Sequence, residues 1–172
     1  MARIPLIAPD DMSEAQKIQY NRFPANLTKA LLRTTCSTEG YLMLGASFPQ
    51  GRINDKDREM IIIRVAALSK SAYERMQHLP LALQAGWGMA QIAAIEDGTL
   101  PGKRENAILN YVDECVHHVR VSETTFSQAA AFFSETQLAE LTLLIGHYMM
   151  TARFLESLNI DLDHTATSWD AV

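Results

Sequence analysis

Apolar residues recur at helical spacing along most of this chain, and no long run alternates between apolar and polar residues. Alternation predicts a half-buried strand, whereas recurrence every three or four residues predicts an amphipathic helix. The few Gly and Pro residues, 8 and 6 respectively, fall mostly where such helices would stop. The sequence therefore predicts an all-α fold with about seven to nine helices.

Capping residues and helix breakers set the limits of the predicted helices. Ser13 and Asn26 are expected to cap two short helices near the start of the chain, and Pro49 stops a third. The stretch 134–137 has the capping-box pattern and begins the longest helix. The predicted helices cover residues 13–21, 26–32, 38–47, 55–68, 72–86, 89–97, 103–120, 122–133 and 135–158.

The helix over residues 55–68 is predicted to be central, because it is apolar on nearly every side after Arg58. Asn54 is expected to accept a hydrogen bond from the free amides at its start. In the next helix, Pro80 cannot donate a hydrogen bond to the carbonyl of Met76, so we expect a kink or a local break there.

A length of 172 residues fits one globular domain, and a hydrophobic fraction of 48% supplies its core. We expect a helical N-terminal extension at residues 1–34, a core at residues 35–163 and a loose tail at residues 164–172. The net charge is −5 and the Lys and Arg residues are scattered, which argues against nucleic-acid binding.

No segment has the length and apolarity of a membrane span, and Pro5 and Pro9 interrupt any apolar region of a signal peptide. Cys36 and Cys115 are the two cysteines, and neither belongs to a CxxC motif. A disulfide framework is not expected, so a reducing cytoplasm is the predicted compartment.

Glu59, Glu74 and His78 form the pattern with the clearest chemical meaning. Glu74 and His78 are four residues apart, so they share one face of a helix. Glu59 lies in a helix that is otherwise apolar, where an unpaired carboxylate costs several kcal/mol. An imidazole takes up and releases protons near neutral pH, and a carboxylate can fix its tautomer. The three side chains are therefore candidates for a proton-transfer site.

On periodicity alone, structural roles for the same residues are favoured. Ser71 and Glu74 also fit a capping box that starts the helix after them. The pair four residues apart could lie on the surface, and Glu59 could simply pair with Arg58 or Arg64.

The candidate residues belong to a wider pattern, an Arg-Glu pair in an apolar helix followed by S-x-x-E-x-x-x-H-x-x-x-A-x-x-x-G, made up of Arg58, Glu59, Ser71, Tyr73, Glu74, His78, Ala82 and Gly86. This pattern resembles the carboxymuconolactone decarboxylase and alkyl hydroperoxidase D superfamily. The likeness covers residues 35–163, including the final helix. It implies an alkyl hydroperoxidase D-like helical bundle that assembles into dimers, trimers or hexamers.

In the hydroperoxidase branch that this chain resembles, a CxxC motif stands at the positions of Ser71 and Glu74. The residues corresponding to Glu59 and His78 relay protons to it. A serine hydroxyl barely ionises near neutral pH and a carboxylate cannot form a disulfide, so thiol redox chemistry at this site is lost. Peroxiredoxin-type activity is therefore a disfavoured alternative that the family label alone supports.

Resemblance to the decarboxylase branch implies instead a lyase that removes carbon dioxide from a small lactone or carboxylic acid and protonates the resulting dienolate. His78 would deliver the proton, Glu74 would orient the imidazole, and Glu59 would be a second member of the relay. No cofactor is expected.

Five further residues are predicted to contact the substrate. Arg58 or Arg64 could hold a carboxylate, because a guanidinium matches its geometry. Ser71 and Tyr73 could donate hydrogen bonds to developing negative charge. His147, on the apolar final helix, could complete the pocket or merely lie in the core.

Glu114 and His118 are four residues apart and next to His117, but ligands on one helix without a second motif are a weak signal, so no metal site is predicted. The helices at 55–68 and 135–158 display more apolar surface than a thin domain hides, so we expect a homo-oligomer. A non-catalytic oligomeric module is the third functional alternative.

Overall fold

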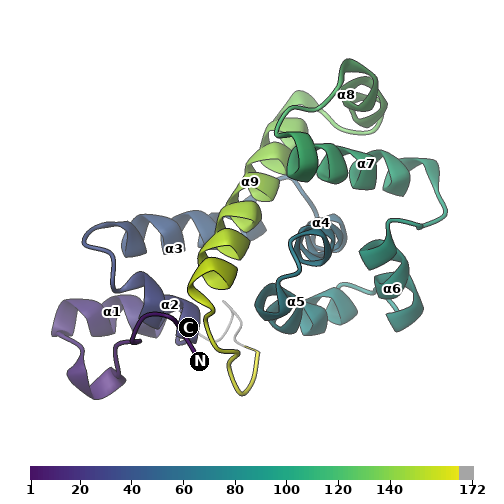
Figure 1. Cartoon of the computed structure of the whole chain (residues 1–172). Helices are drawn as coiled ribbons and strands as arrows, with labels where there is room; N and C mark the ends of the chain where they lie inside the picture. Colours follow the sequence, from purple (N-terminus) through teal and green to yellow (C-terminus); the bar gives the residue numbers. More distant parts are fainter. Residues whose placement is uncertain (167–172) are drawn as a thin grey trace.

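The computed structural model describes residues 1–166, which form nine α-helices and two short 3-10 helices and no strand (Figure 1). The all-α prediction is confirmed for these residues. Residues 167–172 of the predicted tail lie outside the described range. The helices are η1 (Pro9–Asp11), α1 (Glu14–Arg22), α2 (Asn26–Leu31), α3 (Ser37–Ser47), η2 (Phe48–Gln50), α4 (Asp55–Leu68), α5 (Ala72–Gln84), α6 (Met89–Asp97), α7 (Lys103–His118), α8 (Glu123–Ala130) and α9 (Glu135–Leu158).

Helix α4 lies at the centre of the fold, as its composition predicted. Every residue from 59 to 66 is buried, and α5, α6, α7 and α9 surround the helix (Figure 1). Successive helical residues point in different directions, so a continuous buried run requires neighbours on every side. A polar side chain in this run must therefore find its partners inside the protein.

Three predicted N-caps are confirmed by side chains that accept a backbone hydrogen bond, namely Ser13, Asn54 and Ser134. The prediction for Asn26 is wrong. Asn26 is the first residue of α2, and its side-chain amide donates to the carbonyls of Asp161 and Leu162 instead of capping the helix. A partner distant in sequence has replaced the local one.

The local break expected at Pro80 does not occur, because α5 runs without interruption from Ala72 to Gln84. Proline removes one intrahelical hydrogen bond, and the packing of α5 against α4 and α9 supports the helix. Gly86 follows with a φ of 92°, a left-handed value suited to glycine, and the helix ends there.

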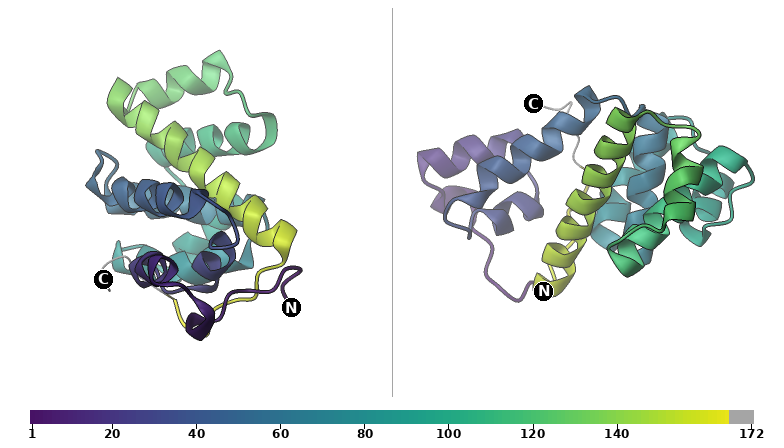
Figure 2. Two further views of the ribbon diagram at one scale, coloured as in Figure 1. Left: turned by 90° about the vertical axis from the view of Figure 1, so that its left-hand side faces the viewer. Right: turned by 90° about the horizontal axis from the view of Figure 1, so that it is seen from above.

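The N-terminal extension, residues 1–34, packs against the core through a second hydrophobic cluster. Phe23 and Leu27 meet Tyr73 of α5 and Leu155 of α9 in this cluster. Figure 2 shows α1 and α2 on one side of α9, with the central helices on the other. The extension thereby adds side chains to the space between α5 and α9.

Helix α9 buries one face and leaves another open. Leu141, Leu144 and Ile145 are buried in the main core, whereas Leu143 and Met150 are 53% and 47% exposed. A second copy of the chain could cover that face, and the homo-oligomer stays a prediction. Within residues 1–166, no helix combines the length and hydropathy that a membrane crossing requires.

Candidate active site

The carboxylate of Glu59 and the imidazole of His78 meet between α4 and α5. Nδ1 of His78 lies 2.8 Å from Oε2 of Glu59, and the two side chains are 12% and 2% exposed. An ionised carboxylate accepts a hydrogen bond from N–H, so the proton of a neutral imidazole resides on Nδ1. Nε2 is then free to act as a base, and the same nitrogen is an acid when the imidazole is charged.

Arg58 supports Glu59 from the opposite side. Its Nε donates to Oε1 of Glu59 at 3.1 Å, and its Nη1 donates to Oδ1 of Asp55 at 2.8 Å. The guanidinium offsets the carboxylate charge that burial would otherwise disfavour. Arg58 is therefore engaged with two carboxylates of its own helix.

His78 faces a small cavity with a volume of about 40 Å³. Its polar lining comes from Glu74, Gln77 and Thr151 besides the imidazole. No Lys or Arg lines it among the residues that the structure describes. Aromatic and aliphatic side chains form the remaining wall: Phe23, Leu27, Tyr41, Tyr73, Tyr148 and Leu155.

Glu74 reaches this cavity from the turn of α5 that precedes His78. It is 1% exposed, and neither carboxyl oxygen has a hydrogen-bond partner within residues 1–166. Burial raises the pKa of the Glu74 carboxyl well above its usual value, the negative charge of Glu156 raises it further, and the Ser71 hydroxyl opposes this with a smaller effect. Burial therefore favours the neutral carboxylic acid form of Glu74.

The expected contact between Glu74 and His78 is not made, because Nδ1 of His78 turns toward α4 and bonds to Glu59. The carboxylate that orients the imidazole is thus Glu59. Spacing along one helix indicated that Glu74 and His78 share a face. It could not show that α4 packs beside this face and offers the Glu59 carboxylate as a charged acceptor.

His147 lies on α9 among three aromatic rings. Its ring centroid is 4.7 Å from that of Tyr41, 5.2 Å from Phe48 and 5.3 Å from Tyr148. Burial lowers the pKa of His147 to about 4, and the positive charge of His78 lowers it further. The imidazole is therefore neutral near pH 7. It stands behind the cavity wall, next to Tyr148, whose ring meets His78 edge-on at 5.0 Å.

Ser71 and Tyr73 occupy structural positions. The Ser71 hydroxyl accepts the backbone amide of Glu74 at 3.5 Å as the N-cap of α5, and Ser71 does not line the cavity. The Tyr73 hydroxyl donates to the carboxylate of Asp163 and accepts the amide of Leu27 at 3.1 Å. The ring of Tyr73 forms part of the wall, but its proton is already engaged.

Arg64 is not brought to the site. Its guanidinium makes two hydrogen bonds of 2.7 Å to Asp113 and one of 2.5 Å to the carbonyl of Glu96. Five residues of an α-helix separate side chains by roughly 140°, so Glu59 and Arg64 point to different sides of α4. The expected role of Arg64 in substrate binding is replaced by a structural one, in which it ties α4 to α6 and α7.

Neither cysteine lines the cavity. Cys36 is exposed just before α3 and Cys115 is buried on α7, where burial raises its thiol pKa to about 11. Glu114, the residue weighed as a metal ligand, accepts hydrogen bonds from Ser122 and Thr125. In the part of the chain that the structure describes, no group of three His, Cys, Asp or Glu side chains is arranged to hold a metal ion.

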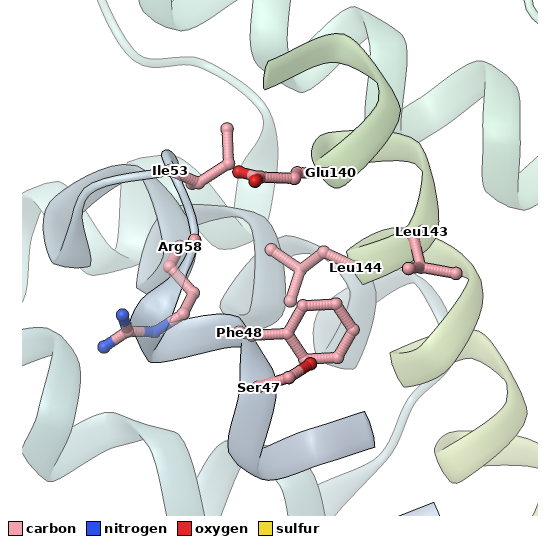
Figure 3. A pocket seen from close by; sticks show the side chains of 8 residues that line it. Ser47, Phe48, Ile53, Arg58, Glu140, Leu143 and Leu144 are labelled. Carbon is pink, nitrogen blue, oxygen red and sulfur yellow. The ribbon is translucent and has the colours of Figure 1, made fainter. Parts of the chain in front are cut away.

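A second hollow, of about 100 Å³, lies beside the stem of Arg58 (Figure 3). Phe48 and Leu144 face each other in it, and the guanidinium of Arg58 points away from Glu140. Oε2 of Glu140 accepts the amide of Arg52 at 2.6 Å. This hollow is larger than the His78 cavity, but no imidazole lines it. We therefore place the candidate chemistry in the smaller one.

The model of the carboxymuconolactone decarboxylase family matches residues 31–114, a range that contains α4, α5 and the Glu59–His78 pair. Over this range the chain is similar to the carboxymuconolactone decarboxylase family. A comparison with curated proteins finds no match to it.

Solved structures extend the likeness of this carboxymuconolactone decarboxylase-like protein over nearly its whole length. An uncharacterized peroxidase-related protein from Ralstonia eutropha JMP134, described as an alkylhydroperoxidase AhpD core, is 14% identical, with 95% of this chain and 93% of that chain covered and a TM-score of 0.77. A peroxidase-related protein from Silicibacter sp. TM1040 has the same identity and TM-score, with 95% and 92% covered. The debrominase Bmp8 is 10% identical, with 92% and 91% covered and a TM-score of 0.75. The TM-scores establish a shared fold, and at identities of 10–14% the likeness establishes the fold alone.

Sequence reasoning missed the residues that close the cavity around the motif. Phe23 and Leu27 come from the extension and Tyr41 from α3, while Tyr148 and Thr151 come from α9. A signal was available for Tyr148, because it lies among the apolar residues of the final helix. Nothing local distinguishes the others, because their role depends on how α1–α3 pack on α5 and α9.

Proposed function

We propose that this carboxymuconolactone decarboxylase-like protein is a proton-transfer enzyme acting on a small lactone or carboxylic acid, with His78 as the group that exchanges the proton. The observation that carries the proposal is the 2.8 Å bond from His78 Nδ1 to buried Glu59, made by an imidazole that also lines a cavity. A fixed tautomer and an available second nitrogen are what general acid–base catalysis requires.

Decarboxylation is the form of this chemistry that the family relationship favours. The C–C bond to the leaving carboxylate breaks, carbon dioxide departs, and the electron pair remains on the substrate as a dienolate. An imidazolium at His78 then donates the Nε2 proton to carbon, and neutral His78 recovers a proton from solvent. Glu59 stays charged throughout and stabilises the imidazolium.

Similarity to the carboxymuconolactone decarboxylase family supports an enzymatic role. Bmp8, which shares the fold, is a debrominase whose C82A variant was determined in complex with 2,3,4-tribromopyrrole. A peroxidase reaction is disfavoured because Ser71 and Glu74 stand at the motif positions and neither Cys36 nor Cys115 lines the cavity. We therefore place the chemistry on the imidazole rather than on a thiol.

One observation favours a second candidate, a non-catalytic oligomeric module. The cavity of about 40 Å³ is far smaller than the several hundred Å³ of most ligand sites. Binding of a substrate therefore requires wall residues such as Phe23 and Leu27 to move. A protein that had lost its chemistry would have no need of that movement.

The deciding experiment compares the wild-type protein with His78→Ala and His78→Gln on a panel of small lactones and carboxylic acids. Carbon dioxide release and incorporation of solvent deuterium are measured by mass spectrometry. We expect a loss of about 100-fold or more in both variants, since acid–base groups contribute about 10²–10⁴, with unchanged helical circular dichroism. His118→Gln, which alters an exposed imidazole on α7, is the matched control.

Equal turnover by the wild-type protein and both His78 variants would remove the imidazole from the mechanism. Absence of both binding and turnover across the panel would support the non-catalytic module instead.

A further inference from the structure

Glu74 lines the cavity but takes no part in the proton transfer proposed for His78 and Glu59. It is 1% exposed, and neither of its carboxyl oxygens has a partner within residues 1–166. Its position four residues before His78 sets the carboxyl group and the imidazole side by side on the cavity face of α5. A buried polar group without a partner costs stability, so a role in ligand binding would explain it.

The hydroxyl protons of Thr151, Tyr41 and Tyr73 in the cavity wall are already engaged. Thr151 Oγ1 donates to the carbonyl of His147 at 2.8 Å, so Tyr41 must be the donor in its 2.5 Å hydrogen bond with Thr151. Tyr73 donates to a carboxylate of the C-terminal segment. A carboxylic acid at Glu74, by contrast, has a free O–H to offer a ligand.

The charges around the cavity do not suit an anion. No Lys or Arg lines it within the described residues, because Arg58 is bound to Asp55 and Glu59 while Arg64 is bound to Asp113. The positive charge that His78 can carry is offset by Glu59. A buried carboxylate without a cation is strongly disfavoured, so a neutral ligand fits better.

We propose that the cavity takes a small neutral carbonyl compound, such as a lactone or cyclic ketone, and catalyses its enolisation with His78 as the base and Glu74 as the acid that binds the carbonyl oxygen. This inference rests on the proposed proton-transfer function of His78, narrows its substrate class to neutral carbonyl compounds, and replaces decarboxylation by enolisation as the form of the reaction. It adds a catalytic residue, Glu74, that would touch the reacting oxygen.

Enolisation uses only groups that the chain supplies. Nε2 of neutral His78 takes a proton from the carbon next to the carbonyl, and the C–H electron pair becomes a C=C bond. The carbonyl π pair moves to oxygen, where the O–H of Glu74 stabilises the negative charge by a hydrogen bond. Return of the proton to the same carbon or to a conjugated one restores the carbonyl, so exchange or isomerisation needs no co-reactant. A carboxylic acid kept neutral by its surroundings is suited to this task.

The test uses two small probes of different charge, α-angelica lactone and levulinate, its ring-opened carboxylate. Binding is measured by ligand-observed NMR, and uptake of deuterium from D₂O is followed by mass spectrometry against an enzyme-free background. The proteins compared are the wild type, Glu74→Gln and Glu123→Gln, which makes the same substitution at an exposed position of α8.

We expect the lactone to bind at least about tenfold more tightly than levulinate and to exchange faster with the wild-type protein and with Glu123→Gln. Glu74→Gln should lower kcat for exchange by about 10²–10³ with little change in KM, because the lost hydrogen bond strengthens in the transition state. The infrared band of a protonated carboxylic acid should be present in the wild-type protein and missing from Glu74→Gln.

Equal binding of the two probes, no binding of either, or unchanged exchange in Glu74→Gln would overturn the inference. If turnover of a carboxylic acid depends on His78 but not on Glu74, the result supports the proposed function and contradicts the enolisation. If the lactone binds through Glu74 without any proton exchange, the proposed function falls and takes the enolisation with it.

Discussion

Oε2 of Glu59 accepts a hydrogen bond of 2.8 Å from Nδ1 of His78, so a carboxylate on the central helix and an imidazole on the next one form a buried pair. Arg58 holds the other carboxylate oxygen at 3.1 Å. The Glu59 carboxylate therefore has two roles, because it links α4 to α5 and also fixes the tautomer of the His78 imidazole.

Glu59→Gln should destabilise the protein by about 3 kcal/mol, since removal of one partner leaves the other charges of a buried network uncompensated. The loss is measurable as a change in the free energy of unfolding in urea. Glu14→Gln, which alters an exposed pair with Lys17, provides the control. A Glu59→Gln protein as stable as the wild type would show that the buried pair contributes little to the fold.

Glu74→Gln should gain stability relative to the wild-type protein as the pH rises. In the folded state the pKa of Glu74 is raised above its usual value of 4.5. Above pH 4.5 the unfolded chain releases a proton that the folded protein keeps, so the contribution of Glu74 to the unfolding free energy falls as pH increases. The gain of Glu74→Gln over the wild-type protein should therefore begin near pH 4.5 and grow as the pH rises above it. Chemical denaturation across this range measures it, and parallel curves would contradict the buried neutral acid.

His147→Phe should make the protein less sensitive to acid. The pKa of His147 is about 4 when folded and 6.5 ordinarily, so the unfolded chain binds a proton first as the pH falls. The stability that neutral His147 contributes is therefore complete above pH 6.5 and is lost toward pH 4. This interval corresponds to about 3 kcal/mol. As the pH decreases from 7 to 4, the unfolding midpoint of the wild-type protein should fall by more than that of His147→Phe, and an equal fall in both proteins would argue that His147 is not held neutral.

Arg64→Lys should lower stability by roughly 2 kcal/mol, because an ammonium cannot reproduce the two-point contact with Asp113 and the bond to the Glu96 carbonyl. Any activity that depends on His78 should survive in this variant at temperatures where it is folded. Loss of turnover with unchanged thermal stability would indicate that Arg64 binds the substrate after all.

The local sequence determined the helices and the identity of the reactive groups. Side chains such as Asn54 and Ser134 define helix starts by bonding amides three residues away, and the apolar run of α4 requires a central position. These are short-range effects, so they can be read along the chain. The same reading brought Glu59, Glu74 and His78 forward as chemical candidates.

Only the tertiary structure decided which of these groups meet and in which charge state. His78 bonds to Glu59 across two helices, the carboxyl group of Glu74 is buried beside it without a partner among the described residues, and Arg64 bonds to Asp113 instead. Hydrogen-bond partners and burial depend on elements far apart in sequence, here the extension, α3 and α9 around α5. Helical spacing determines which way each side chain points from its own helix. Which residues it then meets, and how deeply it is buried, are determined only when the helices pack together.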